Sequence, residues 1–149
     1  MILFNQMGLS PGVLRAVEDL GYEIPTPVQE QTIPALLEQS RDIVAYAQTG
    51  TGKTAAFGLP VVQQVDCSTP LTQALVLCPT RELCMQITRD LSGFAKYLPS
   101  LQILPVYGGA SIGEQIRKLE RGAQVVVATP GRAVDLIRRA MTESQEHET

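Results

Sequence analysis

The sequence predicts an α/β domain built on a parallel sheet. Short runs that are apolar at nearly every position alternate with segments of helical periodicity, and turn residues separate the two. Strands of this kind are typical of parallel sheets that helices cover on both faces. The length of 149 residues and the hydrophobic content of 44% suit one compact globular domain rather than a disordered or fibrous chain.

Two helices are predicted ahead of the first strand. Each begins with a hydroxyl residue followed by proline at the first helical position, at Ser10-Pro11 and at Thr26-Pro27. Apolar residues then recur at helical spacing, and Gly21 ends the first of these helices. Residues 1–40 are therefore expected to form a helical segment that precedes the sheet.

Residues 41–140 are expected to form the sheet and its helices. The predicted strands are Ile43–Tyr46, Ala74–Leu77, Ile103–Val106 and Val125–Ala128. The helices that follow them are predicted at Lys53–Gln64, Arg81–Phe94, Ile112–Arg121 and Arg132–Ala140. Ligands of such sheets bind beyond the carboxyl ends of the strands, where helix N-termini offer free N–H groups. We therefore expect the functional residues in the turns that follow the strands.

The turn after the first predicted strand has the pattern of a phosphate-binding loop. Its backbone N–H groups, from Thr49 through Gly50 and Thr51 to Gly52, can wrap the phosphates of a nucleotide. Lys53 can reach the β and γ phosphates, and the Thr54 hydroxyl can bind Mg²⁺. A glycine-rich turn with a chance Lys-Thr is the alternative, but the apolar run before it and the helix after it favour the phosphate loop. The whole turn reads Ala47-Gln48-Thr49-Gly50-Thr51-Gly52-Lys53-Thr54.

Gln29 and Phe4 suggest which nucleotide binds. The amide of Gln29 carries a donor and an acceptor, which suit N6 and N7 of adenine, and an aromatic ring such as Phe4 suits stacking on the base. The alternatives are a solvated glutamine on a helix and a phenylalanine in the core. ATP is therefore the expected nucleotide.

The net charge of −3 comes from the end of the chain. Glu143, Glu146 and Glu148 lie in residues 143–149, which hold no Lys or Arg, and the rest of the chain is neutral. A neutral body predicts modest electrostatic affinity for nucleic acid, through a few basic groups at the right turns. Residues 141–149, which contain the only histidine, His147, are expected to form a polar, disordered tail.

Cysteine spacing and hydropathy indicate the compartment. Cys67, Cys78 and Cys84 lack the paired short spacing of a zinc site, so reduced thiols are expected. No window approaches the roughly 18 apolar residues of a membrane span, and the N-terminus lacks a basic segment followed by a long apolar stretch. These features predict a soluble, cytoplasmic protein that binds neither zinc nor membrane.

Five segments occur in a characteristic order, namely residues 21–29 with Phe4 ahead of them, 47–54, 79–83, 108–109 and 129–132. Together they make the chain similar to the DEAD-box RNA helicases. The resemblance implies a RecA-like P-loop fold that binds ATP and Mg²⁺. It also implies that Gln29, together with Tyr22 or Phe4, reads the adenine. Residues 21–29, with Phe4 ahead of them, resemble the family's Q motif, and residues 47–54 its motif I. Residues 79–83 resemble motif Ia, residues 108–109 the GG element, and residues 129–132 motif Ib.

The same resemblance assigns RNA binding to the three later turns. N–H groups near helix starts, at Thr80 and Gly131, suit phosphate oxygens, which hold a strand without reading its sequence. Single-stranded or structured RNA, bound through its backbone, is the expected partner. For Arg81 the alternative is a salt bridge with Glu82 or a neighbouring acid, and for Arg132 a solvated helix start. The residues expected to bind RNA are Pro79, Thr80, Arg81, Glu82, Gly108, Gly109, Thr129, Pro130, Gly131 and Arg132.

The chain departs from the family's pattern after residue 140. Members continue to an Asp-Glu-Ala-Asp motif, to Ser-Ala-Thr and to a second helicase domain, none of which occurs in these residues. Hydrolysis needs acids that hold Mg²⁺ and orient water, so no catalytic residue is expected here. The sheet is expected to be incomplete at its C-terminal strands, with open edges that pair with other chains.

Three functions compete at this point. The first is the ATP-binding and RNA-binding N-terminal portion of an ATP-dependent RNA helicase, within a longer chain that supplies hydrolysis and a second domain. The second is a catalytically inactive nucleotide-binding and RNA-binding fragment. The third is a small-molecule or nucleotide kinase, which shares the phosphate loop but leaves Gln29, Arg81 and Arg132 unexplained.

Overall fold

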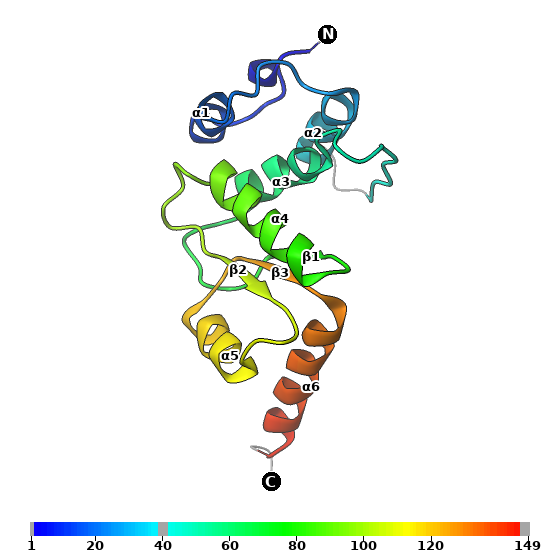
Figure 1. Ribbon diagram of the computed structural model, residues 1–149. Coiled ribbons are helices and arrows are strands. Elements are labelled where there is room, and N and C mark those ends of the chain that lie inside the picture. The colour runs from blue at the N-terminus through cyan, green and yellow to red at the C-terminus, as the bar shows by residue number, and fades with distance from the viewer. Residues whose placement is uncertain (1, 39–41, 147–149) are drawn as a thin grey trace. The chain divides into compact units, whose positions relative to one another are not determined.

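The structure is a computed structural model that describes residues 2–38 and 42–146, with side chains described up to residue 143. The chain begins with a short 3₁₀ helix, Phe4–Gln6, and continues through helices and strands in the order shown in Figure 1. The helices are α1 (Pro11–Asp19), α2 (Pro27–Glu38), α3 (Lys53–Gln64), α4 (Arg81–Phe94), α5 (Ile112–Arg121) and α6 (Pro130–Glu146). The strands are β1 (Ala74–Leu77), β2 (Ile103–Val106) and β3 (Val125–Ala128).

The strands form a parallel sheet, which confirms the predicted α/β class. The order is β1-β3-β2, and β3 pairs in parallel with both neighbours. All four residues of β3 are buried, as expected for the central strand of a covered sheet. The strands end in register, because Leu77 and Val106 both lie opposite Ala128.

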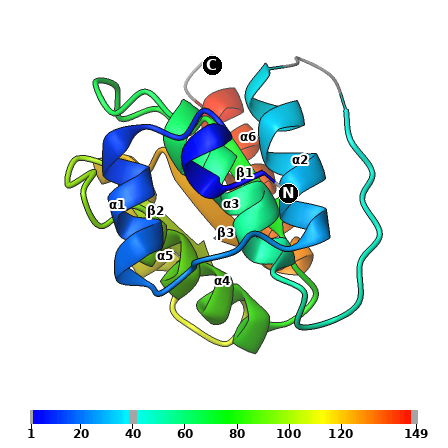
Figure 2. The same cartoon turned by 90° about the horizontal axis from the view of Figure 1, so that it is seen from above.

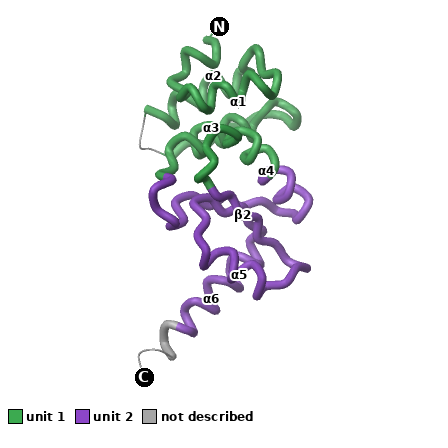
Figure 3. Tube along the Cα trace, turned by 90° about the vertical axis from the view of Figure 1, so that its left-hand side faces the viewer, with its two compact units in different colours: residues 1–66, 89–101 green, residues 67–88, 102–149 purple. Residues whose placement is uncertain are grey.

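The chain groups into two compact units, coloured separately in Figure 3. Unit 1 comprises residues 1–66 and 89–101, and unit 2 comprises residues 67–88 and 102–149. Helix α4 contributes its second half to unit 1 and its first half to unit 2. These units group the residues differently from the expected segments 1–40 and 41–140, because α2 packs against the helix that follows the phosphate loop.

Unit 1 is a helical body. Figure 2 shows α2 and α3 side by side, and these two helices pack against each other. Gly58 on α3 allows a close approach to α4, since a Cβ there would lie 2.6 Å from the Leu91 side chain and 3.1 Å from the Phe94 ring. Leu91 and Phe94 are almost fully buried. The helix that carries the phosphate loop is therefore fixed by packing on two sides.

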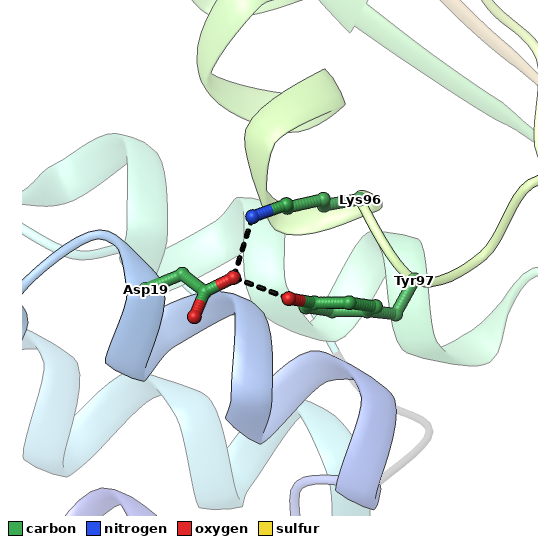
Figure 4. Close-up of polar contacts among 3 residues, drawn as sticks. All are labelled: Asp19, Lys96 and Tyr97. Carbon is green, nitrogen blue, oxygen red and sulfur yellow. Dashed lines mark hydrogen bonds and ion pairs between the residues drawn. The ribbon is translucent and has the colours of Figure 1, made fainter.

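A polar cluster joins α1 to the turn after α4 within unit 1 (Figure 4). Lys96 Nζ donates to Asp19 Oδ2 at 2.6 Å, and the Tyr97 hydroxyl donates to the same oxygen. The guanidinium of Arg15 lies 4.4 Å from the centre of the Tyr97 ring. The hydrogen bonds from Lys96 and Tyr97 lower the pKa of Asp19 below its ordinary value.

Unit 2 contains the sheet. Helices α5 and α6 pack on one of its faces, through a cluster around Val106, Val126 and Ala128 that also includes Leu119 of α5 and Leu136 of α6. Across the strands, Leu75 and Leu77 pair with Val126 and Ala128 and therefore lie on this same face. Yet Leu75 and Leu77 are 55% and 56% exposed.

The expectation of a strand at Ile43–Tyr46 is wrong. Residues 42–48 are assigned neither strand nor helix, and Val44 and Tyr46 are 78% and 93% exposed. A strand requires backbone hydrogen bonds to a neighbour, and among the described residues no strand pairs with this segment. The apolar composition of the segment was therefore not sufficient to make it a strand.

The C-terminal helix is longer than expected. Helix α6 continues through residues 141–146, which were expected to belong to a disordered tail. Met141, Glu143 and Gln145 are good helix formers, and neither Gly nor Pro interrupts them. Residues 147–149, including His147, lie outside the described residues.

Candidate nucleotide-binding and RNA-binding sites

The phosphate loop of unit 1 depends on two glycines. Gly50 and Gly52 have φ of +77° and +79°, which side chains rarely adopt. Gly52 is the N-cap of α3 and supplies no side-chain capping bond to the first turn. The N–H groups at the start of α3 therefore remain available to an anion, at the positive end of the helix dipole.

Side chains within the loop bind its own carbonyl oxygens. Lys53 Nζ donates to the Ala47 oxygen at 2.7 Å, and the Thr51 hydroxyl donates to the Gln48 oxygen at 2.6 Å. Ion pairs among the described residues join Lys96 to Asp19 and Lys118 to Glu114, so Lys53 is not held by a carboxylate. Its ammonium group thus lies across the loop, where it can exchange a carbonyl for a phosphate oxygen.

Gln29 is bonded directly to the phosphate loop. It is 4% exposed, so the alternative of a solvated glutamine is wrong. Its Oε1 accepts from the Thr26 N–H at 3.0 Å, and its Nε2 donates to the Gly52 carbonyl at 3.1 Å. A Cβ on Gly52 would lie 2.2 Å from Nε2. The amide still has one N–H and one lone pair for a further partner.

Phe4 and Tyr22 lie together but apart from Gln29. Their ring centres are 6.3 Å apart, and Tyr22 also meets Phe94 edge-on at 6.3 Å. Phe4 is 4% exposed, whereas Tyr22 is 38% exposed. Both line a pocket of about 350 Å³ that includes neither Gln29 nor the phosphate loop. The structure therefore brings Phe4 to Tyr22 and Gln29 to Gly52, but it does not gather all four at one pocket.

A larger pocket of unit 1 borders the phosphate loop itself. It measures about 730 Å³ and lies between α2 and residues 42–48. Gln48 and Thr51 of the loop belong to its lining, as does Thr32 of α2. The loop therefore has a cavity on the side of α2, although Gln29 of the same helix does not line it.

Thr54 occupies the first turn of α3, where its hydroxyl could join Mg²⁺ to a bound phosphate. The described residues contain no group of three or more His, Cys, Asp or Glu that could hold a metal ion. Mg²⁺ commonly takes few protein ligands and completes its shell with water and phosphate oxygens. A magnesium site at Thr54 would therefore depend on the nucleotide.

In unit 2, the three other turns lie at one end of the sheet. They follow β1, β2 and β3, whose last residues are in register. The Thr80 hydroxyl accepts from the Leu83 N–H at 3.2 Å and so caps α4. The turns thus form a row in the strand order, with the turn after β3 in the middle.

Arg81 lies against the turn that follows β2. Its guanidinium is 4.8 Å from the centre of the Tyr107 ring, and a Cβ on Gly109, whose φ is +85°, would lie 3.5 Å from Arg81 Nη1. The salt bridge considered between Arg81 and Glu82 is not among the ion pairs of the described residues. Arg81 is exposed and keeps its charge free for a ligand.

Arg132 is engaged inside unit 2, so the alternative of a solvated helix start is wrong. Its Nη1 donates to the Ala110 carbonyl at 3.1 Å and to Gln115 Oε1 at 2.9 Å. Its Nε is buried and has no hydrogen-bond partner among the described residues. Gln115 was not predicted from the sequences of the turns, and its signal is a polar residue at a buried position of α5.

Cys78 and Cys84 are free thiols. Cys78 and Cys84 are buried, and burial raises the pKa of both, that of Cys84 to about 11. Cys84 Sγ donates to the Val127 carbonyl at 3.1 Å. These thiols fill the core beside the RNA-binding candidates and are poor nucleophiles or metal ligands at neutral pH.

Comparisons with known proteins identify the family of the chain. The DEAD/DEAH box helicase family model matches residues 26–148. The ATP-dependent RNA helicase DeaD of Mycobacterium tuberculosis is 51% identical over 137 residues, which cover 92% of this chain and 24% of that protein. No described helix has the length and apolar character needed to cross a membrane.

Solved structures give the same result for the fold. A DEAD box protein from Methanococcus jannaschii superposes with a TM-score of 0.89 at 39% identity, over 94% of this chain and 38% of that one. Yeast Dbp5 L327V bound to RNA and ADP BeF3 superposes at 0.81 with 32% identity, over 92% of this chain and 34% of that one. The chain spans about a quarter of the length of the curated relatives it matches. It belongs to the DEAD/DEAH box helicase family.

Proposed function

We propose that this chain is the ATP-binding and RNA-binding N-terminal portion of a DEAD-box ATP-dependent RNA helicase. The observation that carries the proposal is the bond from Gln29 Nε2 to the Gly52 carbonyl. It ties the side chain suited to adenine to the loop suited to phosphates, so one nucleotide can meet both. A glycine-rich turn with no ligand would not require a buried glutamine hydrogen-bonded to its backbone.

Nucleotide selectivity tests this proposal. The free N–H and lone pair of Gln29 match adenine and mismatch guanine, so ATP with Mg²⁺ should bind more tightly than GTP. Gln29→Ala should erase the preference. Lys53→Ala should weaken ATP and GTP alike, because its ammonium acts on phosphates that both share. Calorimetric titration of the three proteins measures all of these affinities, and equal binding of GTP and ATP by the unaltered chain would sink the adenine assignment.

RNA is the second proposed ligand, held at the turns after β1, β2 and β3. Support comes from the exposed Arg81, from the backbone N–H groups near the starts of α4 and α6, and from the relative named as bound to RNA. Contacts of this kind read no sequence, so RNAs of different sequence and equal length should bind alike. Fluorescence anisotropy in a salt series measures this, and a strong sequence preference would contradict it.

We propose that hydrolysis and closure over the ligands depend on a second helicase domain and on acids of a longer chain. The alternative is a catalytically inactive fragment that binds nucleotide or RNA weakly. A phosphate-release assay with and without RNA separates turnover from binding. The free thiols of Cys78 and Cys84 support a cytoplasmic location.

A further inference from the structure

A chain of hydrogen bonds clamps the glycine turn, Tyr107–Ala110, from inside unit 2. Gln115 lies on α5, is 6% exposed, and donates from Nε2 to the Tyr107 carbonyl at 3.1 Å. Its Oε1 accepts from Arg132 Nη1 at 2.9 Å, and that same nitrogen donates to the Ala110 carbonyl at 3.1 Å. The two bonded carbonyls flank the glycine pair, so both ends of the turn are tied to the start of α6.

This clamp acts where the turn cannot fix itself. Gly108 and Gly109 have no side chains to pack, and Gly109 has a φ of +85°. A Cβ at Gly108 would meet nothing within 4 Å. The direction of the backbone N–H groups in the turn therefore depends on its two ends, and Gln115 is the residue that links one of those ends to Arg132.

We propose that Gln115 is a positioning residue for RNA binding, which keeps the glycine turn aligned with the turn Thr129–Arg132. The inference rests on the proposed RNA-binding function. Gln115 itself does not contact RNA, because it is buried and both ends of its amide bind the protein. Without the clamp, RNA would have to order the glycine turn as it binds, and the affinity would fall.

A matched control exists in the same unit. Gln124 is 4% exposed, donates to the Thr69 carbonyl at 2.8 Å, and accepts from the Gln102 N–H at 2.8 Å. It stands just before β3, at the opposite end of the strand from Thr129. Gln115→Leu and Gln124→Leu therefore remove the same chemistry from equally buried sites, but only the first touches an RNA-binding turn.

The test measures affinity for a short oligouridine RNA by fluorescence anisotropy, together with thermal unfolding and amide NMR spectra. Gln115→Leu should weaken RNA binding about tenfold and shift the amide signals of Gly108 and Gly109, whereas Gln124→Leu should lower stability and leave RNA affinity unchanged. Gln115→Glu keeps an acceptor for Arg132 and loses the donor to Tyr107. The RNA affinity of this variant should therefore lie between those of the unaltered chain and Gln115→Leu. If Gln115→Leu does not fold, the RNA affinity of Gln115→Glu tests the proposal in its place.

The outcomes separate the two proposals. Absence of RNA binding by the unaltered chain would overturn the proposed function and this inference with it. Unchanged affinity in a folded Gln115 variant would overturn the inference alone. Equal weakening in the Gln124→Leu control would also overturn it, because the loss would then reflect general destabilisation.

Discussion

Gly52 meets two separate demands at the end of the phosphate loop. Its φ of +79° disfavours any side chain, and a Cβ would lie 2.2 Å from Gln29 Nε2, closer than atoms can approach. Gly50 has nearly the same φ, but a Cβ added there would meet nothing within 4 Å. Substitutions at Gly50 and Gly52 therefore separate the cost of backbone strain from the cost of a collision with Gln29.

Gly50→Ala should cost about 1 kcal/mol of unfolding free energy, from strain alone. Gly52→Ala should cost at least about 1 kcal/mol more, because Gln29 must give up its bond to the loop. It should also weaken ATP binding, since the loop and the Gln29 amide, which we propose to bind adenine, would move apart. Chemical denaturation and calorimetry measure both effects. If the two variants behave alike, the contact between Gln29 and Gly52 has no energetic weight.

At the scale of elements, the Asp19 cluster ties α1 to the turn after α4. The folded pKa of Asp19 is lowered, first by the hydrogen bond from Lys96 and then by that from Tyr97. A carboxylate whose pKa is lower in the folded than in the unfolded state stabilises the protein at pH values above its unfolded pKa. This contribution disappears as the pH falls through the folded pKa. The pKa of Lys96 is raised in the folded protein. Its contribution to stability is therefore present at neutral pH and disappears in strong alkali.

Asp19→Asn should therefore lower the unfolding free energy at neutral pH, by a small amount because the cluster is exposed. The difference from the unaltered chain should shrink as the pH falls from about 3.8 downward. Glu18→Gln removes the same charge from the neighbouring residue and serves as the control. Urea denaturation at several pH values measures this, and a difference that persists in acid would show that the hydrogen bonds do not depend on the carboxylate.

At the scale of the whole molecule, the two edges of the sheet differ. N–H groups of Val125 and Thr129 donate to the carbonyls of Gln102 and Val106. The backbone groups of Pro105 therefore point away from β3, to the outer edge of β2, and proline has no N–H with which another strand could pair there. β1 bonds to β3 through Ala74 and Cys78, so the groups of Leu75 and Leu77 point to its free side. β1 thus offers an uncharged, proline-free edge beside two exposed leucines, of the kind that pairs with other strands.

We expect the chain to associate through β1 as its concentration rises. Leu75→Lys places a charge at this edge and should reduce association, while Ile103→Lys at the edge formed by β2 should not. Sedimentation velocity over a concentration series measures the effect. A chain that stays monomeric throughout would show that the β1 edge is already protected.

The sequence by itself determined the elements whose signals are local. Helices α1 and α2 begin at the prolines that predicted their starts, and α3 follows the phosphate loop as predicted. The strands β1, β2 and β3 also lie where their apolar runs predicted them. Caps, periodicity and glycine-rich turns act between residues a few positions apart, so the chain carries them in readable form. The family followed from five such segments in the right order.

Tertiary structure decided what depends on distant neighbours. Residues 43–46 have the composition of a strand, but pairing needs a second strand, which no local pattern supplies. Gln29, Arg132 and Gln115 are polar residues on helices, where solvent is the ordinary expectation. Packing instead buried them wholly or in part and gave each a backbone carbonyl as partner, because a polar group removed from water needs a hydrogen bond.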